Sequence, residues 1–256
     1  MTMNEVFSAA CELAPIELSN AIVAAVNGYD NSGIILETDR EIEKVLVTLD
    51  LCPQCADFAV KNGYNLIITQ HPAIYAPIKR LDFAGNKALL TCALNGIGVI
   101  SMHLNLDIAE NGIDHSLAMG LGAKRPAVIT EYLDGKGYGR VFNIEKTTLG
   151  AFKHRVCEVF ETENVMIFGN REREIKRVAS FCGAGCDIAE LDKASGVDAV
   201  VSADFKHHVI REALDRGICV VQLTHYASEN YGMKIFATSL AKKIKAKTAY
   251  YGVSDF

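Results

Sequence analysis

Short, strongly apolar runs alternate with helical segments along the chain, and this alternation constrains the fold more than any other feature. We expect strands at EKVLVTLD, NLIITQ and GVISMH, with helices at PQCADFAVKNGY and NKALLTCALNGI between them. A second series, VDAVVSAD, HHVIREALDRG and ICVVQLTH, predicts strand, helix and strand again. This order is typical of a mostly parallel sheet with helices packed against it.

One stretch interrupts the alternation and suggests two lobes. Residues 126–139 are rich in turn formers, including Asp134-Gly135, Gly137 and Gly139. We therefore place a first α/β lobe at residues 1–127 and a second at residues 128–225.

Composition excludes several classes of protein. The 256 residues carry a formal net charge of −5, and Lys and Arg are scattered, so nucleic acid is not an expected partner. We find no apolar run long enough to span a membrane and no signal peptide at the start, and we expect a cytoplasmic protein. The eight cysteines are then expected to be reduced thiols.

Three of the predicted strands end in a histidine. NLIITQ leads to His71, GVISM leads to His103 with Asp107 four residues on, and ICVVQLT leads to His225 with Glu229 four residues on. In open α/β sheets, ligands bind outside the carboxyl ends of the strands. Imidazole and carboxylate together suit Zn, Fe, Mn, Co or Ni, and the set suffices for one or two ions.

Other residues invite competing interpretations. Cys52-Pro53-Gln54-Cys55 resembles a glutaredoxin-type motif, which would indicate a redox or zinc role instead. Cys182 and Cys186 flank a glycine turn, and we interpret both cysteines as incidental. The catalytic residues are left open. Three residues that follow VDAVVSA are candidates for substrate contact or proton transfer, namely Asp204, Lys206 and His208. The alternative interpretation is that they form a solvated helix start.

Longer motifs then resemble one family over nearly the whole chain. In order, they are YDNSGIIL, TQHPAIYAPIKRL, SMHLNLDIAENGIDHSLAMGLG and THYASENYGMK. They are similar to segments of the GTP cyclohydrolase I type 2 homologues, which are interacting-factor-like proteins with a dinuclear metal centre and a toroidal hexamer.

The resemblance implies a role for each ligand and an arrangement of the lobes. His71 and Asp107 would bind one ion, His103 and His225 the other, and Glu229 would bridge the two. The fold would be two related α/β lobes with the metal site in the cleft between them. Residues 226–256 would return to the first lobe, and the chain would assemble with itself into a hexamer.

One departure from the family concerns residue 70. Many relatives carry His-His-Pro where this chain has Gln70-His71-Pro72. An amide oxygen is a poorer transition-metal ligand than imidazole, so Gln70 would leave the second ion weakly bound or absent.

The leading hypothesis for function is a metal-dependent hydrolase. The family name implies GTP as the substrate, although the chain has no glycine-rich phosphate loop, and another small molecule stays open. The alternative is a non-enzymatic metal-binding or regulatory ring protein, because ligands alone do not prove turnover.

Overall fold

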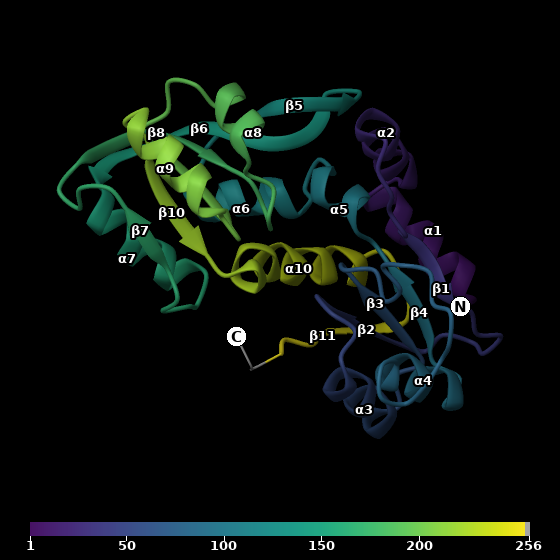
Figure 1. Ribbon diagram of the computed structural model, residues 1–256. Helices are drawn as coiled ribbons and strands as arrows, with labels where there is room; N and C mark the ends of the chain where they lie inside the picture. Colours follow the sequence, from purple (N-terminus) through teal and green to yellow (C-terminus); the bar gives the residue numbers. More distant parts are fainter. Residues whose placement is uncertain (254–256) are drawn as a thin grey trace. The chain divides into compact units, whose positions relative to one another are not determined.

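The computed structural model describes residues 1–253 and shows a mixed α/β chain (Figure 1). Within those residues it contains two sheets and ten helices, so the predicted α/β fold class is confirmed, and both sheets are mixed. The chain forms two compact units, described separately below. The first unit comprises residues 1–109 and the described residues from Met233 onward, and the second comprises Glu110–Gly232.

The first unit contains a five-stranded sheet in the order β1-β4-β3-β2-β11. Strands β11, β2, β3 and β4 are parallel, and β1 pairs with β4 in the antiparallel sense. The central strands are almost continuously apolar, as expected for parallel strands covered on both faces. The strands are β1 (Gly33–Leu36), β2 (Lys44–Thr48), β3 (Leu66–Thr69), β4 (Gly98–Ser101) and β11 (Lys247–Tyr250).

Local signals explain where the helices of this unit begin and end. In α3, Cys52 is the N-cap, Pro53 occupies the first turn, and Gly63 closes the helix at φ 70°, where a side chain would be strained. The helices are α1 (Met3–Leu13), α2 (Ile16–Val26), α3 (Pro53–Asn62), α4 (Lys87–Leu94) and α5 (Leu104–Ile108). The core between α3, α4 and the sheet includes Leu46, Cys55, Ile67 and Cys92.

The second unit contains a six-stranded sheet in the order β5-β6-β8-β9-β10-β7. Its strands β8, β9 and β10 are parallel, while the remaining pairs are antiparallel. The strands are β5 (Ala127–Leu133), β6 (Lys136–Thr148), β7 (Met166–Phe168), β8 (Glu174–Ser180), β9 (Ala199–Ala203) and β10 (Cys219–Leu223). The helices are α6 (Ile113–Gly120), α7 (Leu149–Val159), α8 (Ile188–Lys193) and α9 (His207–Asp215). Helix α10 (His225–Ala241) begins here and ends in the first unit.

The two compact units divide the chain at other residues than the predicted lobe boundaries, 127/128 and 225/226. The segment 110–127 belongs to the second unit because α6 packs on β6 and β8, where Asp114 and Arg140 form a buried ion pair. The turn-rich segment 126–139 is not a bare connection, since it holds β5 and the start of the long strand β6. The final helix begins at His225 and is followed by β11, a strand that helical periodicity did not predict.

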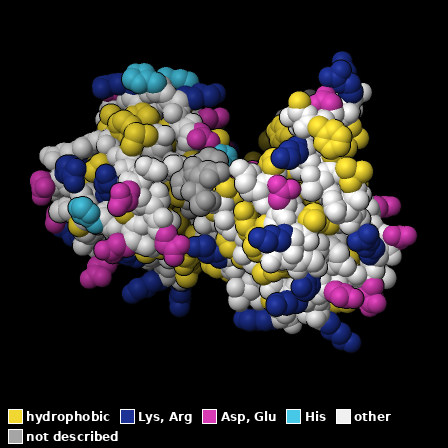
Figure 2. Space-filling model, turned by 90° about the horizontal axis from the view of Figure 1, so that it is seen from below, with side chains coloured by type: hydrophobic (Ala, Val, Ile, Leu, Met, Phe, Trp, Pro, Cys, Tyr) yellow, Lys and Arg dark blue, Asp and Glu magenta, His cyan; other side chains and the backbone are white. Residues whose placement is uncertain are grey.

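No single helix in the described part of the chain is long and apolar enough to cross a membrane, and only α1 and α2, bent by 63°, pass that test as a pair. Figure 2 shows basic and acidic side chains interspersed over one face of the molecule rather than gathered by sign.

The Asp114–Arg140 pair fixes α6 to β6 inside the second unit. Arg140 Nη1 lies 2.9 Å from Asp114 Oδ2, and both side chains are almost fully buried. Arg140 also donates to the carbonyl oxygens of Gly137 and Gly139, and Asp114 accepts a hydrogen bond from the Cys182 backbone N–H at 3.2 Å. Removing one partner of such a pair leaves a buried charge without compensation.

We therefore expect Asp114→Ala to lower the free energy of unfolding by about 3–5 kcal/mol in urea denaturation followed by circular dichroism. The control is Asp215→Ala, which removes an exposed ion pair with Arg211 and should change stability by about 0.5 kcal/mol or less. Equal losses for the two variants would contradict the structural role of the buried pair.

Candidate metal centre

In the first unit, three of the predicted ligands gather where adjacent parallel strands end. His71 lies just beyond β3, and His103 lies just beyond β4, where it begins α5. Their ring centroids are 5.9 Å apart. Asp107 follows on α5 and is buried. The two strands pair in register from Leu66 with Gly98 to Thr69 with Ser101. Each histidine follows the last paired residue of its strand by two positions, so both lie at the same edge of the sheet.

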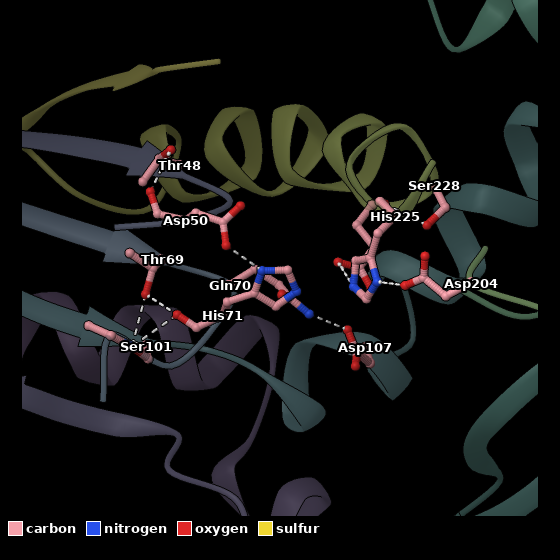
Figure 3. Close-up of polar contacts among 12 residues, drawn as sticks. Thr48, Asp50, Thr69, Gln70, His71, Ser101, Asp107, Asp204, His225 and Ser228 are labelled. Atoms are coloured by element: carbon pink, nitrogen blue, oxygen red, sulfur yellow. Dashed lines mark hydrogen bonds and ion pairs between the residues drawn. The ribbon is translucent and has the colours of Figure 1, made fainter. Parts of the chain in front are cut away.

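His71 is held by an aspartate that sequence reasoning did not select. Asp50 follows β2, the neighbouring parallel strand, and its Oδ1 lies 2.6 Å from His71 Nδ1 (Figure 3). The backbone supports this pairing, because the N–H groups of Gln70 and His71 both donate to the carbonyl oxygen of Leu49 at 3.1 Å. A carboxylate on Nδ1 fixes the ring orientation and places the coordinating lone pair on Nε2.

His103 has the same kind of partner. Its Nδ1 lies 2.7 Å from Asp30 Oδ1, and Asp30 also accepts hydrogen bonds from Ser19 and Ser32. Burial by itself would raise the pKa of Asp30, but these hydrogen bonds outweigh it and lower the pKa to about 2. For His103, burial favours the neutral ring, yet the Asp30 hydrogen bond and the Asp107 charge raise its pKa overall. The YDNSG segment therefore serves to hold this imidazole.

Gln70 is fully buried and faces Asp107. Its Nε2 donates to Asp107 Oδ1 at 2.7 Å (Figure 3). Its Oε1 is buried and has no hydrogen-bond partner within the described residues. The amide thus orients a predicted metal ligand through its nitrogen and presents a buried oxygen of its own.

The second unit repeats the pairing of strand-end aspartate and histidine. Asp204 follows β9 and His225 follows β10, its parallel neighbour, with Asp204 Oδ2 2.6 Å from His225 Nδ1 (Figure 3). Asp204 adopts φ 48°, a left-handed conformation that costs a non-glycine residue energy and that clusters at functional sites. One turn along α10, buried Glu229 places Oε2 3.3 Å from His225 Nε2.

A glycine loop lies against this pair. Gly183 has φ 55°, and a Cβ there would stand 2.4 Å from Glu229 Oε1 and 3.1 Å from the His225 ring. Only glycine leaves this space open. The preceding residue, Cys182, lies close to the same carboxylate, since it has a ligand atom within 4.8 Å of one from Glu229.

A cavity of about 570 Å³ in the second unit is lined in part by Asp204 and His225. Its lining includes amide, hydroxyl and phenol groups alongside two carboxylates: Glu163, Asn164, Asp204, Gln222, Thr224, His225 and Tyr226. Of the other candidates, Lys206 caps α9 and His208 lies in its first turn, both exposed, as for a solvated helix start. Asp204 is the member of that trio that reaches a predicted ligand.

The donor chemistry fits a transition metal. Three histidines have Nδ1 paired with a carboxylate, the arrangement that orients metal-binding imidazoles in proteins. Asp107 and Glu229 add buried carboxylates, and burying such groups without compensation is unfavourable. Gln70 Oε1, which is buried and has no hydrogen-bond partner among the described residues, is a further oxygen that a metal ion could satisfy. These groups could hold a metal ion.

Comparison with known proteins places these residues in a family context. The model of the family described as Duf34/NIF3 (NGG1p interacting factor 3) matches residues 1–254. The chain is 26% identical over 225 residues to the GTP cyclohydrolase 1 type 2 homolog of Clostridium acetobutylicum, covering 85% of this chain and 81% of that protein. The predicted resemblance to this family is confirmed.

Two solved structures show the same fold. A Bacillus cereus protein related to NIF3 aligns with a TM-score of 0.85 at 18% identity, covering 100% of this chain and 97% of that one. The reduced HcgD protein of Methanocaldococcus jannaschii aligns with a TM-score of 0.81 at 25% identity, covering 100% and 98%.

The aspartates behind the histidines provide a direct test of the centre. We expect Asp50→Asn to weaken metal binding by about 10–100-fold, because a neutral amide lacks the negative charge that raises the basicity of the His71 ring. Competition with a chromogenic chelator measures the dissociation constant. Asp57→Asn, an exposed change on α3, is the matched control. Unchanged affinity in Asp50→Asn would remove His71 from the ligand set.

Proposed function

Because this chain belongs to the Duf34/NIF3 family, we propose that it binds one or two divalent transition-metal ions and acts as a metal-dependent hydrolase. The observation that carries the proposal is the carboxylate behind each of His71, His103 and His225. Structural histidines need no such partner, whereas metal ligands gain orientation and basicity from it.

We assign the ligands by donor type and by family resemblance. By that resemblance, His71 and Asp107 would hold one ion, His103 and His225 would hold the other, and Glu229 would serve both. Gln70 holds Asp107 in place, and its neutral oxygen makes the second ion the weaker one.

The chemistry follows from these groups. A bound divalent ion lowers the pKa of water toward about 7 and so supplies hydroxide at neutral pH. Asp50, Asp30 and Asp204 keep the Nδ1 protons of the three histidines in place.

The cavity beside His225 suggests what is hydrolysed. Asn164, Gln222 and Thr224 can hydrogen-bond the edge of a nitrogen heterocycle, and Tyr226 offers a ring face. Glu163 and Asp204 are anionic, and the described residues that line the cavity include neither lysine nor arginine, so phosphate groups are disfavoured in it. We propose a substrate with a heterocyclic base. GTP, named by the relatives, is the first to test, with its base in this cavity.

The family description also names an interacting factor, which favours a second candidate. In that case the chain is a non-enzymatic metal-binding or regulatory protein that assembles with itself and holds partners. Tight metal binding without turnover of any nucleotide would support it over the hydrolase.

The Glu229→Ala variant tests whether metal binding can be lost while the fold is kept. We expect Glu229→Ala to lose most bound metal in elemental analysis while keeping the circular dichroism spectrum, because the bridging carboxylate is gone. Glu145→Ala, an exposed change on β6, should keep full metal content. Full metal content in Glu229→Ala would refute the bridging assignment.

Turnover is tested with the same two variants. Metal-loaded native protein and Glu145→Ala should release formate from GTP if the ring is opened at C8, and Glu229→Ala should release at least about 100-fold less. If native protein with full metal content releases no formate, GTP is not the substrate, and a screen of other heterocyclic nucleosides follows.

The homohexamer is a separate proposal from family resemblance. We expect light scattering at micromolar concentration to give about six times the chain mass of 27.9 kDa. A monomer mass would refute it without affecting the metal assignment.

A further inference from the structure

Two cysteines outside the proposed metal ligands stand at the start of α3. Cys52 is the N-cap, with extended backbone at φ −111° and ψ 163°, and Cys55 lies three residues on, in the first turn. The Cys55 backbone N–H donates to Cys52 Sγ at 3.4 Å. The Cys-x-x-Cys spacing therefore places both cysteines at one helix end, with the first sulfur already receiving a backbone hydrogen bond.

We propose that Cys52 and Cys55 form a redox-active dithiol, in which Cys52 attacks an external disulfide and Cys55 then closes an intramolecular disulfide. This inference does not depend on the proposed hydrolase function.

The surroundings favour Cys52 as the attacking group. It is partly exposed, whereas Cys55 is fully buried, so Cys52 is the more accessible of the two sulfurs. Its sulfur accepts the Cys55 backbone N–H and lies at the N-terminal end of α3. The first turn of α3 carries no acidic side chain that would oppose the negative charge.

Cys55 has the opposite character, as a resolving cysteine requires. It is fully buried in the core between α3, α4 and the sheet. Burial, together with the charges of Cys52 and Cys92, raises the pKa of Cys55 to about 12. Cys55 therefore stays protonated and out of reach of external reagents until a sulfur is bound next to it at Cys52.

The reaction balances with a small-molecule disulfide such as oxidised glutathione. The Cys52 thiolate attacks one glutathione sulfur, a bond forms between them, the glutathione disulfide breaks, and one glutathione leaves as a thiolate. Cys55 Sγ then attacks Cys52 Sγ, the bond between Cys52 and glutathione breaks, and the second glutathione leaves with the proton of the Cys55 thiol. Two electrons pass from the protein to the two glutathione molecules.

Cys92 is the main alternative partner with which Cys55 could form a disulfide. It is buried on α4 in the same core, and burial raises its pKa to about 12. A Cys55–Cys92 bond would link two helices inside the core, whereas the proposed bond lies within one helix start. Cys92→Ala therefore distinguishes the two pairings, and Cys11→Ser, at a half-buried cysteine on α1, serves as the remote control.

The experiment uses the full chain in glutathione redox buffers, quenched with iodoacetamide and analysed by mass and peptide mapping. We expect native protein to lose two of its eight thiols to a Cys52–Cys55 disulfide that dithiothreitol reverses. Cys92→Ala and Cys11→Ser should behave like native protein. Cys55→Ala should accumulate glutathione on Cys52, and Cys52→Ser should leave Cys55 unmodified.

Three outcomes would overturn the proposal. They are retention of all eight thiols in the most oxidising buffer, a disulfide that maps to Cys92, and glutathione on Cys55 in Cys52→Ser. Thermal melting of each variant checks that it is folded, and Cys55→Ser replaces Cys55→Ala if the latter is not. In reduced protein, Cys52 should also react with Ellman's reagent about tenfold faster than Cys11.

Discussion

The contact between a carboxylate and a histidine Nδ1 at the end of parallel strands is the interaction on which the site depends. An imidazole at the end of a strand can rotate and can carry its proton on either nitrogen. A carboxylate 2.6–2.7 Å from Nδ1 removes both freedoms. Two of the three aspartates come from the neighbouring parallel strand, so the sheet itself sets the geometry. Asp50 follows β2 beside β3, and Asp204 follows β9 beside β10.

This constraint explains why so much charge is buried at these edges. Asp30, Asp107 and Glu229 are largely removed from solvent, which is unfavourable for lone carboxylates. Around Asp30, hydrogen bonds from His103, Ser19 and Ser32 outweigh the cost of burial and keep the group ionised. Around Asp107, the Gln70 amide does part of the same work. The groups that stabilise the anions are also those that aim the proposed ligands.

The loops that follow the parallel strands carry cysteine and glycine residues as well as the aspartates and histidines. The loop after β2 carries Asp50, which holds His71, and two residues later Cys52, which begins α3. In the second unit, the loop after β8 carries Cys182 and Gly183 close to Glu229. Because a parallel sheet collects the carboxyl ends of its strands at one edge, short loops there hold polar groups that would otherwise be distributed over the surface.

The sequence by itself determined the α/β class, most strands and helices, and the histidine at each of three strand ends, because hydrophobic periodicity and strand endings are local properties. It did not identify Asp30 or Asp50 as partners, since the pairs Asp30–His103 and Asp50–His71 join residues far apart in the chain. It also missed β11, and it placed the lobe boundary at 127/128, whereas residues 110–127 cluster with the second compact unit. Strand β11 forms because its backbone completes the edge beside β2, and α6 belongs with β6 because Asp114 pairs with Arg140 in the core. Such pairings are decided only when tertiary structure brings distant segments together.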